Sequence, residues 1–217
     1  MYGRAEGVVG DLLTAIDGHD KAFLATKVWT RGEASGIDQM NESFRRFRTD
    51  VIDLMQIHNL VDWRTQLRTI RAWKGAERFR YIGITHYTAG AFDELAAVMR
   101  TEDLDFVQLP YSIVLRAAER ELLPLAADRG IAVIVNRPFE GGGLFRRQRA
   151  PLPPGVREHG IESWSQLFLK YVLAEPAVTC VIPGTANPSH LADNLAAGRG
   201  PMPDASVRAE LIRAVGA

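Results

Sequence analysis

The stretch that most constrains the fold is the apolar run Val51-Ile-Asp-Leu-Met-Gln-Ile-His58-Asn59. It is about as long as a strand, lies between segments with helical periodicity, and ends in a histidine and an asparagine. A run of this kind is typical of a central strand in a parallel sheet that is covered on both faces. A titratable ring at the last residue of such a strand lies at the carboxyl edge of the sheet, where barrel and doubly wound folds place their chemistry.

The segment before this run repeats the pattern with another ionisable group. Ala22-Phe-Leu-Ala-Thr-Lys27-Val-Trp29 is again mostly apolar and has a lysine near its end. Lys27 and His58 are therefore expected at the ends of neighbouring strands. Taken singly, a strand-end histidine is more often structural, and a strand-end lysine more often reaches solvent, because burying an unpaired charge is costly.

Candidate strands begin roughly every 25–30 residues, and a helical pattern follows each of them, which is the βα repeat of a parallel α/β fold. The strands are expected at 22–29, 51–58, 78–86, 105–111, 131–135 and 179–183. The helices are expected at 6–16, 36–47, 63–73, 91–99, 117–129, 163–173 and 188–197, with a short helical end after 204. The Gly-, Arg- and Pro-rich stretch 140–154 is expected to be a poorly ordered loop.

These patterns amount to about six βα units. A closed barrel has eight units and typically about 250 residues. A doubly wound open sheet accommodates six units, so a length of 217 residues favours the open sheet. No Pro/Ser-rich linker divides the chain, which predicts a single domain over residues 1–217.

Charge and cysteine content exclude several classes of protein. Lys plus Arg and Asp plus Glu both number 26, so the formal net charge is zero. No broad basic field would then attract nucleic acid or an anionic membrane, and Arg146-Arg147-Gln-Arg149 is interpreted as a solvated loop. Cys180 is the single cysteine, so intramolecular disulfides are excluded. No apolar run approaches the roughly 18 residues of a membrane span and no leader peptide opens the chain, which predicts a cytoplasmic protein.

A series of short motifs is more specific than these patterns. In chain order the motifs are Met1-Tyr2-Gly3-Arg-Ala-Glu, Thr26-Lys27-Val-Trp29, Gln56-Ile-His58-Asn59, Gly83-Ile-Thr85-His86-Tyr87, Gln108 and Ile182-Pro-Gly-Thr185. In this order and at barrel spacing, from residue 1 to the C-terminus, the chain resembles the aldo/keto reductases, which are NAD(P)H-dependent (β/α)8 barrels that reduce aldehydes and ketones. The resemblance favours the barrel over the open sheet.

The resemblance implies a catalytic group of an aspartate, a tyrosine, a lysine and a histidine. By match, Tyr2 is the tyrosine, Lys27 the lysine and His58 the histidine. The aspartate would lie ahead of Tyr2, where this sequence has no residue, and the family's first strand, first helix and second strand have no counterpart. The implied fold class is therefore an α/β (β/α)8 TIM barrel that is N-terminally incomplete, with about six of eight βα units. Its two open sheet edges would leave the chain marginally stable or would be covered by another chain.

The implied reaction reduces a small carbonyl substrate, with the hydride supplied by the nicotinamide cofactor. A tyrosine has a pKa of about 10 in water, and the Lys27 ammonium would bring the pKa of Tyr2 closer to the range useful for proton transfer. His58 would donate a hydrogen bond to the substrate oxygen. Trp29, Asn59 and Trp63 come just past strand ends and are expected to line the substrate pocket, with packing as the alternative role for the two tryptophans.

The same resemblance implies a site for NADP(H) or NAD(H). The nicotinamide carboxamide would contact Thr85, His86 and Gln108, and the next strand would contribute Asn136, Arg137 and Pro138. Glycines 141–143 would either bring backbone amides to a phosphate or form a flexible loop. The remaining nucleotide contacts would be Gly184, Thr185, His190 and Asn194, with the N-terminus of the helix from Pro188 facing a phosphate. Gly184 and His190 stand where many members have basic residues, so the preference between the two nucleotides is left open.

Two other hypotheses compete with the reductase. The missing aspartate suggests a catalytically impaired module that binds a cofactor or a partner without turnover. The third hypothesis is a different (β/α) enzyme with a phosphate site at 184–190. It is the weakest of the three, because the sequence shows no Asp/Glu/His cluster that indicates a metal. The expected partners are a small carbonyl and, if a second chain completes or covers the open edges, an oligomer, with no nucleic acid and no membrane. Export is the alternative to a cytoplasmic location, because some related bacterial members carry a twin-arginine leader.

Overall fold

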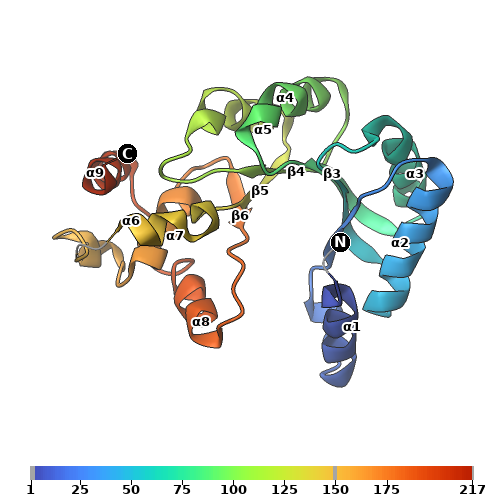
Figure 1. Ribbon diagram of the computed structural model, residues 1–217, viewed down its shortest axis with the longest axis horizontal. Helices are drawn as coiled ribbons and strands as arrows, with labels where there is room; N and C mark the ends of the chain where they lie inside the picture. The colour runs from blue at the N-terminus through green and yellow to red at the C-terminus, as the bar shows by residue number, and fades with distance from the viewer. Residues whose placement is uncertain (1–2, 149–150, 217) are drawn as a thin grey trace. The chain divides into compact units, whose positions relative to one another are not determined.

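The computed structural model describes residues 3–148 and 151–216 (Figure 1). Six strands occur in this part of the chain, in the order β1-β2-β3-β4-β5-β6. β1 pairs with β2, β2 with β3, and β5 with β6, all in parallel. Each of the six predicted strands is present, and their bounds are Ala25–Val28, Ile52–His58, Phe79–Thr85, Phe106–Pro110, Ala132–Asn136 and Val178–Val181.

Helices lie between the strands in the predicted alternation. From α1 to α9 their bounds are Ala5–Ala15, Glu33–Phe47, Trp63–Gly75, Phe92–Thr101, Leu122–Arg129, Gly143–Arg147, Trp164–Leu173, Pro188–Ala196 and Ala205–Val215. Short 3-10 turns, η1 to η5, occupy His19–Lys21, Ala89–Ala91, Ala117–Arg120, Glu140–Gly142 and Val156–His159.

Two predicted segments are wrong in detail. The single helix expected at 117–129 is broken at Glu121, whose φ of −144° and ψ of −55° separate η3 from α5. The loop expected at 140–154 contains η4 and α6, because Leu144 is buried there at 3% exposure. Phe145 of the same helix packs against Phe139 and Phe168. Apolar contacts thus stabilise a short helix in a segment whose glycine and arginine content predicts a loop.

The chain forms two compact units, of which the first comprises residues 1–86 and 102–107, and the second residues 87–101 and 108–217. In the first unit, α2 and α3 cover one face of β1–β3 (Figure 1). Thr26 and Val28 are buried, whereas Ala25 is exposed and Lys27 is half-buried. Because successive side chains of a strand point to opposite faces, Lys27 points away from α2.

Segment 102–107 is tied to β3 within the first unit. The Asp105 carboxylate accepts hydrogen bonds from the backbone N–H of Ile82 at 2.8 Å and from Lys74 Nζ at 2.6 Å. A Cβ on Gly83 would lie 2.5 Å from the carbonyl oxygen of Phe106, which is too close for any side chain. Glycine at position 83 is therefore required by the approach of the two strands.

Helix α1 packs against α2 through its one buried residue, Gly10. A Cβ at that position would lie 2.1 Å from the carbonyl oxygen of Arg46. The other side of α1 is apolar yet exposed: Val8 is 48% exposed, Leu12 58% and Ile16 70%. These three residues are four apart along the helix, so they form one stripe, which we call the α1 apolar stripe.

In the second unit, α7 is the most buried helix of the described chain, and both α8 and α9 contact it. Helix α9 is held by Arg208, which donates to the Tyr111 hydroxyl at 2.6 Å and to Glu175 at 2.8 Å. Glu119 accepts hydrogen bonds from the hydroxyls of Tyr111 at 2.5 Å and Tyr171 at 2.9 Å. A buried polar network thus joins elements that are far apart in sequence.

Candidate active site

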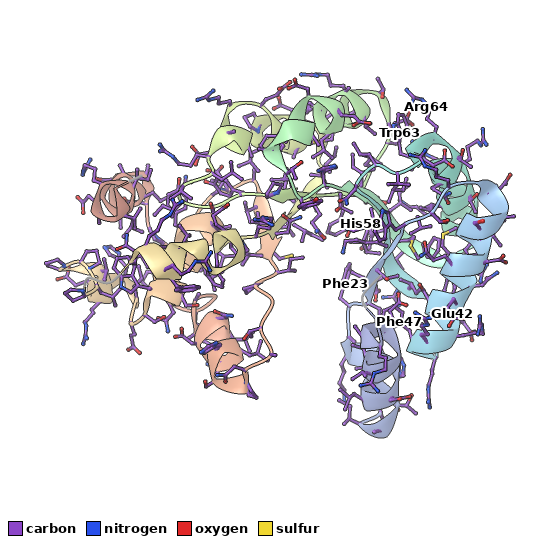
Figure 2. All side chains as sticks on the ribbon, viewed as in Figure 1. Phe23, Glu42, Phe47, His58, Trp63 and Arg64 are labelled. Carbon is purple, nitrogen blue, oxygen red and sulfur yellow. The ribbon has the colours of Figure 1, made fainter. Side chains whose placement is uncertain are left out.

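Lys27 and His58 point to the same face of the first unit's sheet. β1 and β2 pair with Lys27 beside Gln56, which lies two residues before His58 on its strand. The period of two along a strand then places all three side chains opposite α2. The rings of Trp29 and His58 meet edge to face, with centroids 5.4 Å apart. Figure 2 shows His58 among these strands and Trp63 at the start of α3.

Burial changes the protonation of both groups. The pKa of Lys27 is lowered from 10.5 to about 8 by loss of water around the ammonium. The pKa of His58 is lowered from 6.5 to about 4, first by burial and then by the positive charges of Lys27 and His86. At neutral pH, His58 is therefore an uncharged imidazole close to a lysine that is near its own pKa. A neutral imidazole can donate one hydrogen bond to a polar oxygen.

The loop after His58 is strained. Asn59 has a φ of 53° and Asp62 a φ of 47°, both in the left-handed region that non-glycine residues rarely adopt. The Asp62 carboxylate accepts the backbone N–H of Gly32 at 2.8 Å, which ties this loop to the segment after β1. Strain of this kind concentrates at functional sites, where the surrounding structure maintains it.

The predicted substrate-pocket residues all lie in the first unit. Trp29 is 49% exposed, whereas Asn59 and Trp63 are half-buried. Trp29 follows β1, Asn59 follows β2, and Trp63 is the first residue of α3. All three therefore come just after the carboxyl end of a strand, as the sequence predicts, and their role as pocket residues stays a prediction.

The predicted nicotinamide contacts are distributed over the chain. Tyr2 lies outside the described residues. Thr85 is buried at the end of β3, and His86 follows it in the first unit. In the second unit, Gln108 of β4 is 6% exposed and Asn136, the last residue of β5, is 8% exposed. Their contacts with a nicotinamide ring stay predictions.

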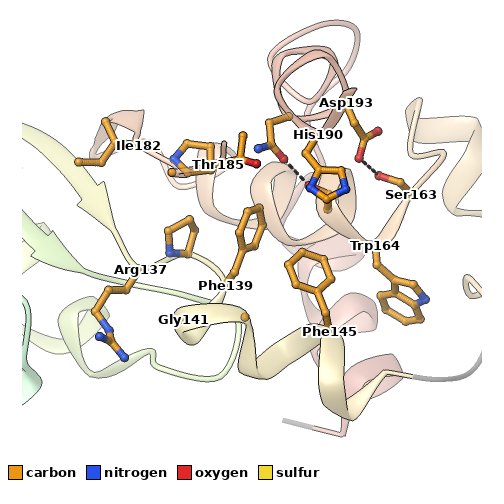
Figure 3. Close-up of a pocket in the computed structure, with 16 residues that line it drawn as sticks. Arg137, Phe139, Gly141, Phe145, Ser163, Trp164, Ile182, Thr185, His190 and Asp193 are labelled. Atoms are coloured by element: carbon orange, nitrogen blue, oxygen red, sulfur yellow. Dashed lines mark hydrogen bonds between the residues drawn. The ribbon is translucent and has the colours of Figure 1, made fainter. Parts of the chain in front are cut away.

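A pocket of about 630 Å³ opens in the second unit (Figure 3). It brings together six residues that the sequence assigns to the cofactor, namely Arg137, Pro138, Gly184, Thr185, His190 and Asn194. Residues 137–145 follow β5, residues 163–165 begin α7, and residues 182–194 run from the end of β6 into α8. Ends of two adjacent strands and the starts of two helices thus form one cavity.

One side of the pocket is aromatic. The rings of Phe139 and Phe145 have centroids 4.9 Å apart, and Trp164 stacks on Phe168 at 5.6 Å. Figure 3 shows Phe139, Phe145 and Trp164 along the cavity. Side chains of this kind suit a flat, apolar ring.

The other side of the pocket suits an anion. Asn187 caps α8, because its Oδ1 accepts the backbone N–H of Ser189 at 2.9 Å. Thr185 Oγ1 in turn accepts the N–H of Asn187 at 3.1 Å, which fixes the turn into the helix. The N-terminus of α8 carries the positive end of the helix dipole.

Two guanidinium groups lie beside the glycines of the pocket. Arg137 Nη2 is 3.9 Å from the position of a Cβ on Gly141, and Arg146 Nη1 is 3.6 Å from that of a Cβ on Gly142. Both glycines line the pocket and have positive φ, 61° and 84°, a conformation that glycine adopts without strain. An aromatic wall, the Arg137 guanidinium, a helix N-terminus and a volume in the usual range for small-molecule sites suit a ligand that carries flat rings and an anionic group.

Several pocket residues are absent from the sequence-based prediction. They are Phe139, Phe145, Ser163, Trp164, Ser165, Ile182 and Asp193. Ser163-Trp-Ser-Gln166 has the Ser-x-x-Gln pattern of a helix N-terminal capping box, and this signal could have marked the start of α7 as a site of polar contacts. The aromatic residues carry no such signal, because only tertiary packing brings them to the cavity.

Among residues 3–148 and 151–216, no group of three or more His, Cys, Asp or Glu residues is arranged to hold a metal ion. No helix in the described part of the chain combines the length and apolar character needed to cross a membrane.

Parallel βα units place a lysine and a histidine at neighbouring strand ends, and the second unit holds a pocket with the volume of a small-molecule site. Comparison with known proteins gives the family. The chain belongs to the aldo/keto reductase family, whose model matches residues 1–210. The fold is accordingly that of a (β/α)8 barrel of which six strands are present in the described residues.

This chain spans only part of the length of the following similar proteins. Aldo-keto reductase YhdN of Bacillus subtilis is 27% identical over 147 residues, which cover 62% of this chain and 44% of YhdN. The NADH-specific methylglyoxal reductase of Escherichia coli is 26% identical over an alignment 252 positions long with its gaps, which covers 90% of this chain and 75% of that protein. The structure of aldo-keto reductase AKR11C1 from Bacillus halodurans in its holo form is 27% identical with a TM-score of 0.74, and the match covers 97% of this chain and 76% of that one.

Proposed function

We propose that this chain reduces a small aldehyde or ketone to an alcohol with NAD(P)H. The observation that carries the proposal is the pocket of the second unit, where six cofactor residues predicted from sequence lie around one cavity. When bound, the nucleotide supplies the hydride. Arg137, Thr185 and the N-terminus of α8 hold its pyrophosphate, and the aromatic side chains exclude water from its flat rings. Thr85, His86, Gln108 and Asn136 keep the proposed role of nicotinamide contacts.

Lys27 and His58 are proposed to act on the carbonyl. The neutral imidazole of His58 donates a hydrogen bond to the carbonyl oxygen and withdraws electron density from the carbon. Tyr2 is the proposed proton donor, and the Lys27 ammonium favours the transfer by stabilising the phenolate that remains. Trp29, Asn59 and Trp63 are proposed to orient the substrate. Because methylglyoxal is the substrate in the names of three relatives, a small 2-oxoaldehyde is the proposed first substrate.

The test begins with the nucleotide. NADH and NADPH are titrated separately into the 217-residue chain while its tryptophan fluorescence is followed, because Trp164 lines the pocket. Micromolar, saturable binding that Thr185→Ala weakens severalfold is the expected result. A folded chain that binds neither nucleotide contradicts the proposal.

Turnover is measured next, with methylglyoxal and a panel of aldehydes at saturating nucleotide. The wild-type chain is expected to oxidise the nucleotide, and Lys27→Met to lower kcat by about 100-fold or more with binding of the nucleotide intact, because a general acid–base group contributes roughly that factor. Binding without turnover in the wild-type chain would instead support a cofactor-binding module.

We also propose that the exposed apolar surface of the first unit is covered by a further copy of this chain. The α1 apolar stripe, at 48–70% exposure, supports this proposal. We further propose that residues 1–217 fold as a single domain and that the protein is cytoplasmic. Sedimentation of the purified chain over a range of concentrations tests the association.

A further inference from the structure

Four polar groups close a ring of hydrogen bonds between α7 and α8. Ser163, the N-cap of α7, accepts the backbone N–H of Gln166 at 3.1 Å. The same hydroxyl donates to Oδ2 of Asp193 on α8 at 2.7 Å. Gln166 Nε2 donates to the other oxygen, Oδ1 of Asp193, at 2.7 Å. Figure 3 shows Asp193 and Ser163 facing each other at the edge of the pocket.

The Gln166 side chain is buried, so water cannot take over its hydrogen bonds in this ring. Its side chain is 5% exposed, and its Oε1 also accepts the backbone N–H of Glu162 at 2.9 Å. Both ends of the amide are thereby used, so its orientation is fixed. The Asp193 carboxylate lies at the N-terminus of α7, where the helix dipole favours a negative charge.

Helix α8 depends on such polar contacts because it buries little apolar surface. Its one buried residue is Asn194, whereas Leu191 is 50% exposed and Leu195 62% exposed. Ser165 of α7 donates to Oδ1 of Asn194, beside the ring. With so little apolar packing, the rotation of α8 about its axis is set by hydrogen bonds to α7.

We propose that Gln166 and Asp193 are positioning residues that fix the rotation of α8 and so preorganise the nucleotide pocket. His190, one turn before Asp193, and Asn194, the next residue, both line the cavity. Gln166 does not line it, so its effect on binding passes through Asp193. The identity of the ligand, a nicotinamide nucleotide, rests on the proposed function. The positioning of α8 rests on the hydrogen-bonded ring alone.

The test exchanges donor and acceptor across the ring. Gln166→Glu places a second carboxylate against that of Asp193, and Asp193→Asn replaces one of the two acceptor oxygens of the ring by an amide donor. In the double variant, the new amide at position 193 donates to the new carboxylate at position 166, while the Glu162 N–H and the Ser163 hydroxyl keep their acceptors. Glu162→Gln is the matched control, because it changes an exposed carboxylate to an amide next to the ring.

Two readouts are measured in the full chain: hydrogen exchange of the α8 amides without nucleotide, and the Kd for NADH. Gln166→Glu is expected to raise the exchange rates and the Kd by about tenfold, and Asp193→Asn by less, with the double variant within about threefold of wild type. The control is expected to match wild type in both.

A double variant no better than Gln166→Glu would overturn the inference, as would wild-type exchange in all variants. If Gln166→Glu fails to fold, recovery of a folded chain in the double variant supports the ring, and persistent unfolding counts against it. A wild-type chain that binds no NADH overturns the proposed function, and with it the role of the ring in nucleotide binding. Hydrogen exchange still reports separately whether the ring holds α8.

Discussion

Lys27 and His58 both have lowered pKa values in the folded chain, because burial removes the water that would solvate their charges. Their positions could be predicted from sequence, since both follow apolar runs of strand length. Their pKa values could not, because these depend on which side chains and backbone surround them after folding. Gln56 illustrates the same limit: it is 1% exposed and its Nε2 has no hydrogen-bond partner in the described chain, yet its sequence context is that of an ordinary strand.

Lys27→Met is expected to stabilise the chain at neutral pH by on the order of 1–3 kcal/mol. The folded pKa of about 8 lies below the ordinary 10.5, so the unfolded chain binds more protons between these values. The cost of burying the Lys27 ammonium therefore lowers the free energy of unfolding of the wild type in full below pH 8. That free energy rises as the pH goes from 8 to 10.5. Urea unfolding across this range should show the rise in wild type and in the exposed-residue control Lys21→Met, and a flatter profile in Lys27→Met. Equal slopes in all three proteins would contradict the lowered pKa.

His58→Gln is expected to flatten the acid side of the stability profile. Because the pKa of His58 falls from 6.5 to about 4 on folding, the unfolded chain takes up a proton first as the pH drops. Wild-type stability is then lost between pH 6.5 and 4, by on the order of 1–2 kcal/mol after allowance for partial exposure. Chemical unfolding at pH 4.5 and 7 in the two proteins measures this difference. A wild-type chain as stable at pH 4.5 as at 7 would exclude it.

At the scale of elements, all six strands are predicted from apolar runs, with ends within a few residues of those observed. Errors occur where long-range contacts override local pattern. Leu144 and Phe145 convert a glycine-rich stretch into α6 by packing on the second unit's core. The predicted cofactor residues after β5 and β6 do meet in one pocket, because adjacent parallel strands end at the same edge. Asp193 escaped prediction because its partners, Ser163 and Gln166, lie far from it in sequence.

Arg208→Met is expected to detach α9 from α7. The change leaves the Glu119 and Glu175 carboxylates without their shared guanidinium, at a cost of about 2–4 kcal/mol. Burial and the hydrogen bond to Glu119 raise the pKa of Tyr111, so its hydroxyl stays a neutral donor to Glu119. Hydrogen exchange of α9 and urea unfolding measure the effect, with the exposed Arg213→Met on the same helix as control. Wild-type protection of α9 in Arg208→Met would show that apolar packing alone holds the helix.

At the scale of the whole molecule, the α1 apolar stripe bears on association rather than on the fold of either unit. Leu12→Glu combined with Ile16→Glu is expected to weaken self-association by about tenfold or more, because two apolar side chains at 58% and 70% exposure become charged. Sedimentation equilibrium measures the change, and Thr14→Glu adds one charge on the opposite side of α1 as control. A wild-type chain that stays monomeric at high concentration would rule out coverage of the stripe by a second copy.

The first unit is discontinuous in sequence, since residues 102–107 belong to it while 87–101 belong to the second. On the ribosome, a nascent chain that has released only residues 1–86 presents the Ile82 N–H and the Lys74 ammonium before the Asp105 carboxylate that accepts them exists. The first unit therefore completes its hydrogen bonds only after α4, a helix of the other unit, has been synthesised. No single break in the polypeptide separates the two units, because a cut after residue 86 leaves residues 102–107 with the second unit and a cut after 107 leaves residues 87–101 with the first. A protease that cuts the chain once therefore cannot yield the two units as separate pieces.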